Sequence, residues 1–150
     1  MSLQTPTPFV TCKTGAAWNK SSNKAGLAWV FIEITDAKKN QGSMTQDLVT
    51  SPLIAEALAL RSGLVSAADM NLTQIHIFSD NSTLIRAINN DMQIKEIYEI
   101  ITNIQQIASA FVDISFSHLS RNFNSEADTL AKNAIATLVV SDPLMRGTWT

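Results

Sequence analysis

The sequence has little cysteine, proline or glycine, and it contains no long apolar run. Of its 150 residues, one is Cys, four are Pro and five are Gly. Cys12 cannot form an internal disulfide by itself, so a reducing intracellular compartment (cytoplasm or nucleus) is expected rather than secretion. The sequence does not open with the run of basic and then apolar residues that is typical of a signal peptide. No apolar stretch reaches the ~18 residues that span a bilayer, so no membrane location is expected.

Positive charge is also scarce. Eleven Lys and Arg residues against thirteen Asp and Glu residues give a net charge of -2. Proteins that bind nucleic acid normally present a basic face to the phosphates. Such a face must therefore be local, and its candidates are Lys20 with Lys24, Lys38 with Lys39, and Arg121. A solvated surface charge is the simpler interpretation of each Lys.

The length and the apolar fraction of 45% fit one domain with one core. The first third of the chain contains three short segments rich in β-branched and aromatic residues, separated by clusters of polar turn formers. They predict strands over 9–14, 27–35 and 44–50. Strands joined by short turns form an antiparallel meander.

The apolar period then changes to that of a helix. Ser51 followed by Pro52 predicts a helix start, with apolar residues recurring at helical spacing through about Ala68. Beyond it the pattern predicts a strand over 74–79, a short helix capped by Asp80 or Asn81, a helix over 94–107, a strand over 111–117 and a last helix capped by Asn124. Strands that alternate with helices indicate an α/β layer architecture.

Three acidic residues lie on separate predicted elements. Glu56 lies in the first helix, Asp80 ends the fourth strand, and Asp128 lies one turn into the last helix. Each has a simpler interpretation, namely a solvent-facing carboxylate, a helix N-cap and a favourable helix-dipole charge, respectively. Carboxylates that converge from different elements are what a site for Mg²⁺ and phosphate requires.

Three sequence segments together resemble a known family. They are SPLIAEALAL around Glu56, IHIFSDN around Asp80, and HLSRNFNSEAD over residues 118–128. In order and context they resemble the ribonuclease H family, in particular its plant reverse-transcriptase-like domains. The resemblance implies an α/β, ribonuclease H-like fold over 9–137, with a five-stranded mixed sheet (three antiparallel strands, then parallel strands) flanked by helices. A flexible segment is expected at 1–8 and an irregular tail at 138–150.

The resemblance also implies an activity and a site. It implies Mg²⁺-dependent (Mn²⁺ possible) endonucleolytic cleavage of RNA in RNA–DNA hybrids. Glu56, Asp80 and Asp128 would be the metal ligands, and His118 would assist proton transfer or product release. The expected nucleic-acid contacts are Arg121, Asn124 and Lys20, with a plain solvent charge as the alternative for Arg121.

One position departs from the family pattern. The family's first catalytic Asp ends the opening strand, and in the segment CKTGAAW this position is held by Gly15. Loss of a ligand shared by both metals corresponds to roughly 10²–10⁴ in rate. The basic protrusion of some family members is also absent, since residues 89–96 contain one Lys. We therefore expect impaired cleavage and weak, salt-sensitive binding.

Two other functions remain open at this stage. One is a non-catalytic hybrid-binding domain, and the other is a protein-interaction module, which the low basic charge favours slightly. A monomer is expected. Packing roles, rather than chemistry, are expected for Cys12, His76, Trp18 and Trp29.

Overall fold

The computed structural model describes residues 9–32, 40–90 and 92–141, with side chains described as far as Ala136. Five strands form one mixed sheet in the order β3-β2-β1-β4-β5. The strands are β1 (Val10–Asn19), β2 (Lys24–Ile32), β3 (Gln41–Gln46), β4 (Gln74–Ser79) and β5 (Asp113–His118). β1, β2 and β3 pair antiparallel, whereas β4 pairs parallel with β1 and with β5. This confirms the predicted sheet.

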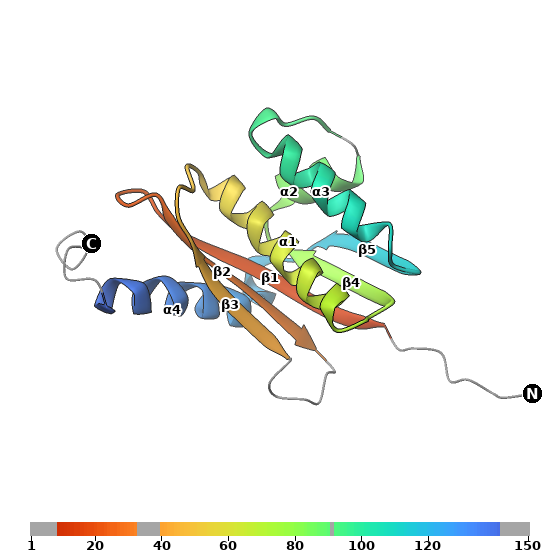
Figure 1. Ribbon diagram of the computed structural model, residues 1–150, viewed down its shortest axis with the longest axis horizontal. Coiled ribbons are helices and arrows are strands. Elements are labelled where there is room, and N and C mark those ends of the chain that lie inside the picture. Colours follow the sequence, from red (N-terminus) through yellow and green to blue (C-terminus); the bar gives the residue numbers. More distant parts are fainter. Residues whose placement is uncertain (1–8, 33–39, 91, 142–150) are drawn as a thin grey trace, which may run out of the picture.

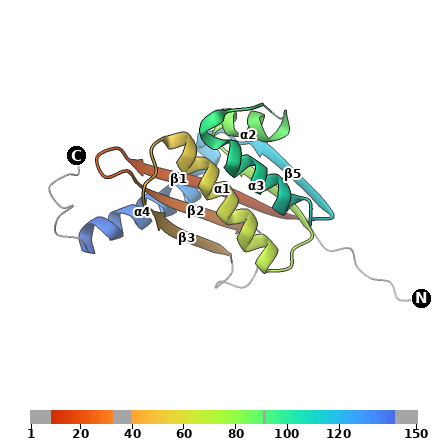
Figure 2. The same ribbon diagram turned by 45° about the horizontal axis from the view of Figure 1, so that its top comes forward.

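Helices cover both faces of the sheet (Figures 1 and 2). They are α1 (Pro52–Asp69), α2 (Ser82–Asn89), α3 (Tyr98–Ala108) and α4 (Ser125–Ser141), with short 3₁₀ turns η1 (Lys95–Ile97) and η2 (Arg121–Phe123). α1 packs on the face of β1 that carries Cys12 and Thr14, as shown by the proximity of both side chains to Gly63 of α1. α4 packs on the opposite face, against Gly15 and Gly26. Within the described residues, no helix is long and apolar enough to cross a membrane.

Side-chain caps fix where two of the helices begin. Ser51 Oγ accepts a hydrogen bond from the Ile54 amide at 3.1 Å, and Pro52 follows at the first helical position. Asn81 Oδ1 accepts a hydrogen bond from the Leu84 amide at 2.9 Å. Asn81, and not Asp80, is therefore the cap of α2, which leaves the Asp80 carboxylate free for other contacts.

Several predicted boundaries were wrong. β1 continues to Asn19, and β3 ends at Gln46 because the backbone turns at Leu48, whose φ is 60°. The helix predicted over 94–107 begins instead as η1 before α3. α4 extends to Ser141, so the irregular tail does not begin at 138, and residues 142–150 lie outside the described residues. The predicted end of β2 also falls outside them.

The largest buried cluster lies between the sheet and helices α1, α2 and α3. It includes Cys12, Leu60, Leu64, Ile75 and Ile77, all fully buried. Burial raises the pKa of the Cys12 thiol well above its ordinary range, so this thiol is a neutral core group, as predicted. This core packs against the first half of β1 and against β4, which lie side by side.

Candidate functional site

The candidate site lies at the carboxyl ends of β4 and β5, beside the middle of β1. The register pairs Thr14 with Ser79 and Ser79 with His118, so Gly15 and Asp80 follow at the same edge of the sheet. Ligands in open α/β sheets bind outside the carboxyl ends of the strands. Glu56 reaches this edge from α1 and Asp128 from α4.

Glu56 is buried beneath the site and is not a solvent-facing residue. Its exposed fraction is 9%, and its Oε2 has no hydrogen-bond partner among the described residues. Burial raises the pKa of Glu56 to about 8, and repulsion from Asp80 and then Asp128 adds to this rise. A hydrogen bond with the Ala16 backbone acts in the opposite direction. At neutral pH this carboxyl group is therefore mostly protonated.

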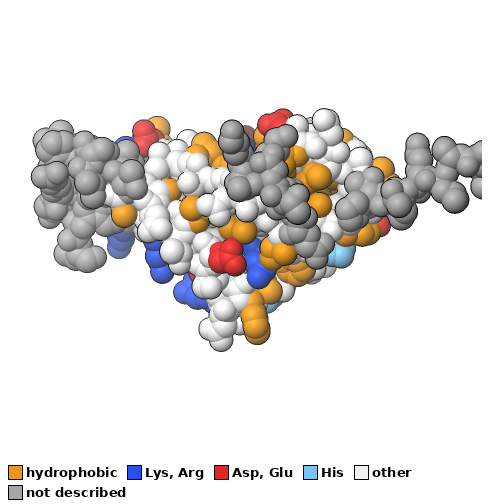
Figure 3. Space-filling view, turned by 90° about the horizontal axis from the view of Figure 1, so that it is seen from below, with side chains coloured by type: hydrophobic (Ala, Val, Ile, Leu, Met, Phe, Trp, Pro, Cys, Tyr) orange, Lys and Arg blue, Asp and Glu red, His pale blue; other side chains and the backbone are white. Residues whose placement is uncertain are grey.

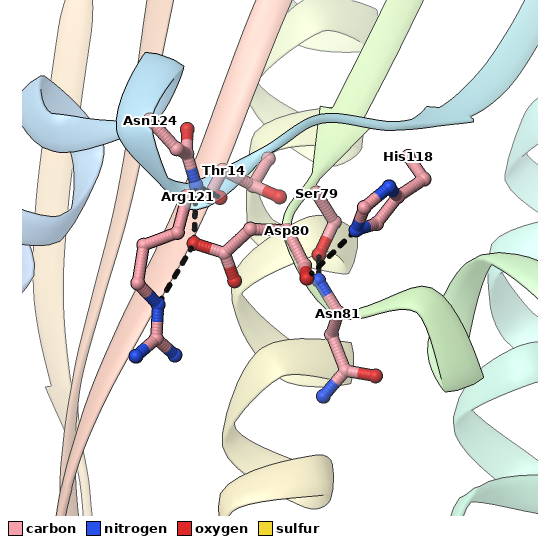
Figure 4. A network of polar contacts seen from close by, with 7 residues as sticks. All are labelled: Thr14, Ser79, Asp80, Asn81, His118, Arg121 and Asn124. Carbon is pink, nitrogen blue, oxygen red and sulfur yellow. Dashed lines mark hydrogen bonds and ion pairs between the residues drawn. The ribbon is translucent and has the colours of Figure 1, made fainter.

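Asp80 is the centre of a polar network (Figure 4). Its side chain is only 4% exposed, and Oδ2 accepts a hydrogen bond from Asn124 Nδ2 at 3.2 Å. Nε of Arg121 lies 3.9 Å from the same oxygen, on a side chain that is 82% exposed. The backbone oxygen of Asp80 lies 3.2 Å from Nε2 of the exposed His118. The network therefore joins β4, β5 and the loop that precedes α4.

Asn124 connects this network to β1. It is fully buried, and its Nδ2 donates to Thr14 O at 2.9 Å as well as to Asp80. Its Oδ1 has no partner among the described residues, so the prediction that its side chain caps α4 is wrong. The physical reason is that the amide is turned as a donor toward two acceptors at the end of the sheet. Only its backbone oxygen begins the helix, by accepting from the Asp128 amide at 3.1 Å.

Asp128 is half-buried in the first turn of α4, over Gly15 in the middle of β1. Burial raises the pKa of Asp128, and the Asp80 carboxylate raises it further. Arg121 and Lys132 act in the opposite direction. Glu56, Asp80 and Asp128 therefore lie close enough to repel one another, and their carboxyl groups form one cluster.

Gly15 lies directly beneath the start of α4. A Cβ atom at Gly15 would lie 2.9 Å from Asp128 Oδ1 and 3.1 Å from both Ala127 C and Asp128 N. The first close contact can be relieved by rotation of the Asp128 side chain, but the other two contacts are with backbone atoms. Any side chain at position 15 therefore requires α4 to move by a few tenths of an ångström.

We tested whether these residues fit a divalent cation. Carboxylates are the ligands that Mg²⁺ prefers, and Glu56 has a buried oxygen without a partner. However, in the described part of the chain no three His, Cys, Asp or Glu side chains are arranged to hold a metal ion. The Asn124 amide and Arg121 engage Asp80 instead. As they stand, Glu56, Asp80 and Asp128 therefore do not form a metal site, and a cation there would require Arg121 to turn away and Glu56 to lose its proton.

The remaining predicted residues lie at different distances from this centre. Arg121 and His118 contact Asp80 directly. Lys20 is exposed in the turn that follows β1, beyond the site itself. Sequence reasoning missed Thr14, whose Oγ1 donates to Phe78 O at 3.1 Å while its backbone oxygen accepts from Asn124. The sequence feature that could have indicated Thr14 is a hydroxyl residue next to Gly15 in an otherwise apolar strand.

Comparisons with solved structures give the fold. RNase H1 from the halophilic archaeon Halobacterium salinarum superposes with a TM-score of 0.76 at 23% identity, over 87% of this chain and 99% of that one. The N-terminal RNase H domain of a Mycobacterium tuberculosis protein, solved as a fusion with maltose-binding protein, gives 0.76 at 19%, over 88% and 96%. LC11-RNase H1 in complex with an RNA/DNA hybrid gives 0.73 at 22%, over 86% and 98%.

Sequence comparison gives the family. No curated protein sequence matches the chain. The sequence model of the reverse transcriptase-like family, in contrast, matches residues 13–134, which include every residue of the carboxylate cluster. Together with the ribonuclease H-like fold, this match shows that the chain belongs to the reverse transcriptase-like family of ribonuclease H-like domains.

Proposed function

We propose that this domain binds RNA–DNA hybrids, and that its Mg²⁺-dependent cleavage of the RNA strand is strongly impaired. The observation that carries the proposal is the carboxylate cluster at the edge of the sheet; beside it lies Gly15, which we align with the first catalytic Asp of the family. The family and the fold support the substrate class, since one structural neighbour was solved with an RNA/DNA hybrid.

The ligand count of the cluster supports the impairment. The Asn124 amide and the Arg121 guanidinium offset the negative charge of Asp80, and a proton offsets that of Glu56. A single Mg²⁺ or Mn²⁺ would replace these groups and neutralise phosphate charge at the site. Two cations acting on the attacking and leaving oxygens require an additional bridging ligand, which Gly15 does not supply.

The exposed side chains around the cluster fit a phosphate backbone. Arg121 is 82% exposed and can turn from Asp80 toward a phosphate, to which a guanidinium binds in a bidentate manner. His118 lies on the exposed rim, where it can exchange protons with a bound strand. Binding should be salt-sensitive because these few cationic groups provide most of the phosphate contacts.

The experiment compares three proteins on one labelled hybrid in Mg²⁺ and in Mn²⁺. They are the natural chain, Gly15→Asp and Gly15→Ala. Gly15→Ala introduces the Cβ contact with α4 without a ligand, so it separates steric strain from chemistry. We expect Gly15→Asp to cleave roughly 10²-fold faster than the other two.

Equal rates in all three proteins would contradict the assignment of Gly15 to the ligand position. A protein that binds neither hybrid nor divalent cation would support a protein-interaction module instead. The net charge of -2 is the observation that favours this second function.

A further inference from the structure

One face of the sheet carries a distinct set of side chains away from the carboxylate cluster. α4 packs over β1, β2 and β3 on the side opposite α1. On this side the register aligns two rows of half-buried residues across β1, β4 and β5. We call them the open face: Thr11, His76 and Ser115 in one row, and Lys13, Phe78 and Ser117 in the other.

The open face combines an aromatic centre with a cation and hydroxyl groups. The ring of Phe9 contacts that of His76 in a tilted arrangement, with centroids 4.4 Å apart. Nζ of Lys13 donates to Phe123 O at 2.9 Å, and the Phe123 residue is 67% exposed. In Figure 3, which shows the molecule from below, hydrophobic side chains gather beside a histidine and beside a Lys or Arg side chain.

This face is continuous with the candidate site. Phe78 lies two residues before Asp80 on β4, and Ser117 directly precedes His118 on β5. The backbone of Phe123, which Lys13 contacts, belongs to the same 3₁₀ turn as Arg121. A nucleic-acid strand that enters or leaves the carboxylate cluster would therefore reach the open face directly.

We propose that the open face binds single-stranded nucleic acid. Bases stack on exposed aromatic rings of a sheet, and phosphates pair with the lysines beside them. The Thr and Ser hydroxyls can hydrogen-bond to sugar and phosphate oxygens, whereas an apolar protein partner would leave them buried without partners. The proposal goes beyond hybrid binding and does not depend on the carboxylates.

The test measures fluorescence anisotropy of labelled eight-nucleotide oligo(U) and oligo(dT), with excess chelator so that no metal contributes. The variant Lys13→Gln/Phe123→Ala removes the cation of the open face and the exposed ring of the neighbouring turn that this cation contacts, while leaving the buried core intact. We expect its affinity for the single strand to fall at least about tenfold. The slope of log affinity against log salt concentration should also decrease by about one, because one fewer counterion is released.

The matched control is Lys95→Gln/Tyr98→Ala, which removes the same two group types from η1 and α3 on the other side of the sheet. Tyr98 is 51% exposed, so this variant should also fold. Its affinity should stay within about twofold of the natural chain. Asp80→Asn should likewise leave single-strand binding unchanged, which separates this inference from the proposed hybrid site.

Cross-linking identifies the contact directly. Oligo(U) containing 4-thiouridine should label peptides that include His76 or Phe78. Labels confined to other surfaces, equal losses in both double variants, or no single-strand binding at ~1 mM would each overturn the proposal. Self-association that the open-face variant abolishes, without any single-strand binding, would assign the face to a second copy of the chain and also overturn it.

Discussion

Glu56→Gln offers the sharpest test of the electrostatics of the carboxylate cluster. Glu56 is 9% exposed and its pKa is raised to about 8 from an ordinary value of 4.5. At about 1.4 kcal/mol per pH unit, this difference corresponds to up to about 5 kcal/mol of folding free energy. Gln keeps the shape of the side chain and cannot titrate.

The direction of the effect follows from proton binding. Between pH 4.5 and pH 8 the folded chain holds a proton on Glu56 that the unfolded chain has released. Stability therefore falls as pH rises through this window, and the loss is complete above pH 8. The raised pKa of Asp128 contributes in the same direction from its own ordinary range upward.

Urea unfolding of the natural chain and of Glu56→Gln between pH 5 and pH 9 measures this effect. The natural chain should lose several kcal/mol across the range, and the variant should lose much less. The absolute stability of the variant is not the readout, because a buried amide has its own cost. Parallel curves for the two proteins would refute the reasoning, since they would mean that Glu56 is ionised in the folded chain.

Two further substitutions test the packing that shapes the site. Asn124→Ala should destabilise the fold by about 2–4 kcal/mol in urea unfolding, because it leaves Thr14 O unpaired and opens a small cavity. An unchanged unfolding midpoint would contradict this role. Gly26→Ala should be much more destabilising than Gly15→Ala, because its Cβ would overlap the backbone oxygen of Ala131. Thermal unfolding compares the two, and the reverse order would mean that α4 packs differently.

The sequence predicted the order of elements because that order depends on local patterns, namely period-2 and period-3.6 apolar spacing. From the resemblance of three segments to the ribonuclease H family, the sequence also predicted the strand order and the convergence of Glu56, Asp80 and Asp128. What it could not predict was the direction of side-chain hydrogen bonds. Asn124 precedes a helix, where a capping role is the usual prediction, yet the proximity of Thr14 and Asp80 turns its amide inward.

Long-range packing also escaped sequence reasoning. From the sequence, Gly15 was interpreted only as a missing ligand. The structure adds that α4 lies so close that a new side chain would press on the Ala127–Asp128 backbone. Likewise, the burial of Glu56 depends on how α1 lies against β1 and β2, which apolar spacing within one helix cannot specify.

Hybrid affinity measured with and without a divalent cation tests the central claim most directly. A labelled RNA–DNA hybrid is titrated at fixed ionic strength in excess chelator, in Mg²⁺ and in Ca²⁺, with the natural chain and Asp80→Asn. The natural chain should bind more tightly with either cation, because a cation at the cluster removes the repulsion between carboxylates and phosphate. Asp80→Asn should blunt that gain. Equal affinity in chelator and in Mg²⁺ would contradict the account, since the carboxylate cluster would then take no part in holding the hybrid.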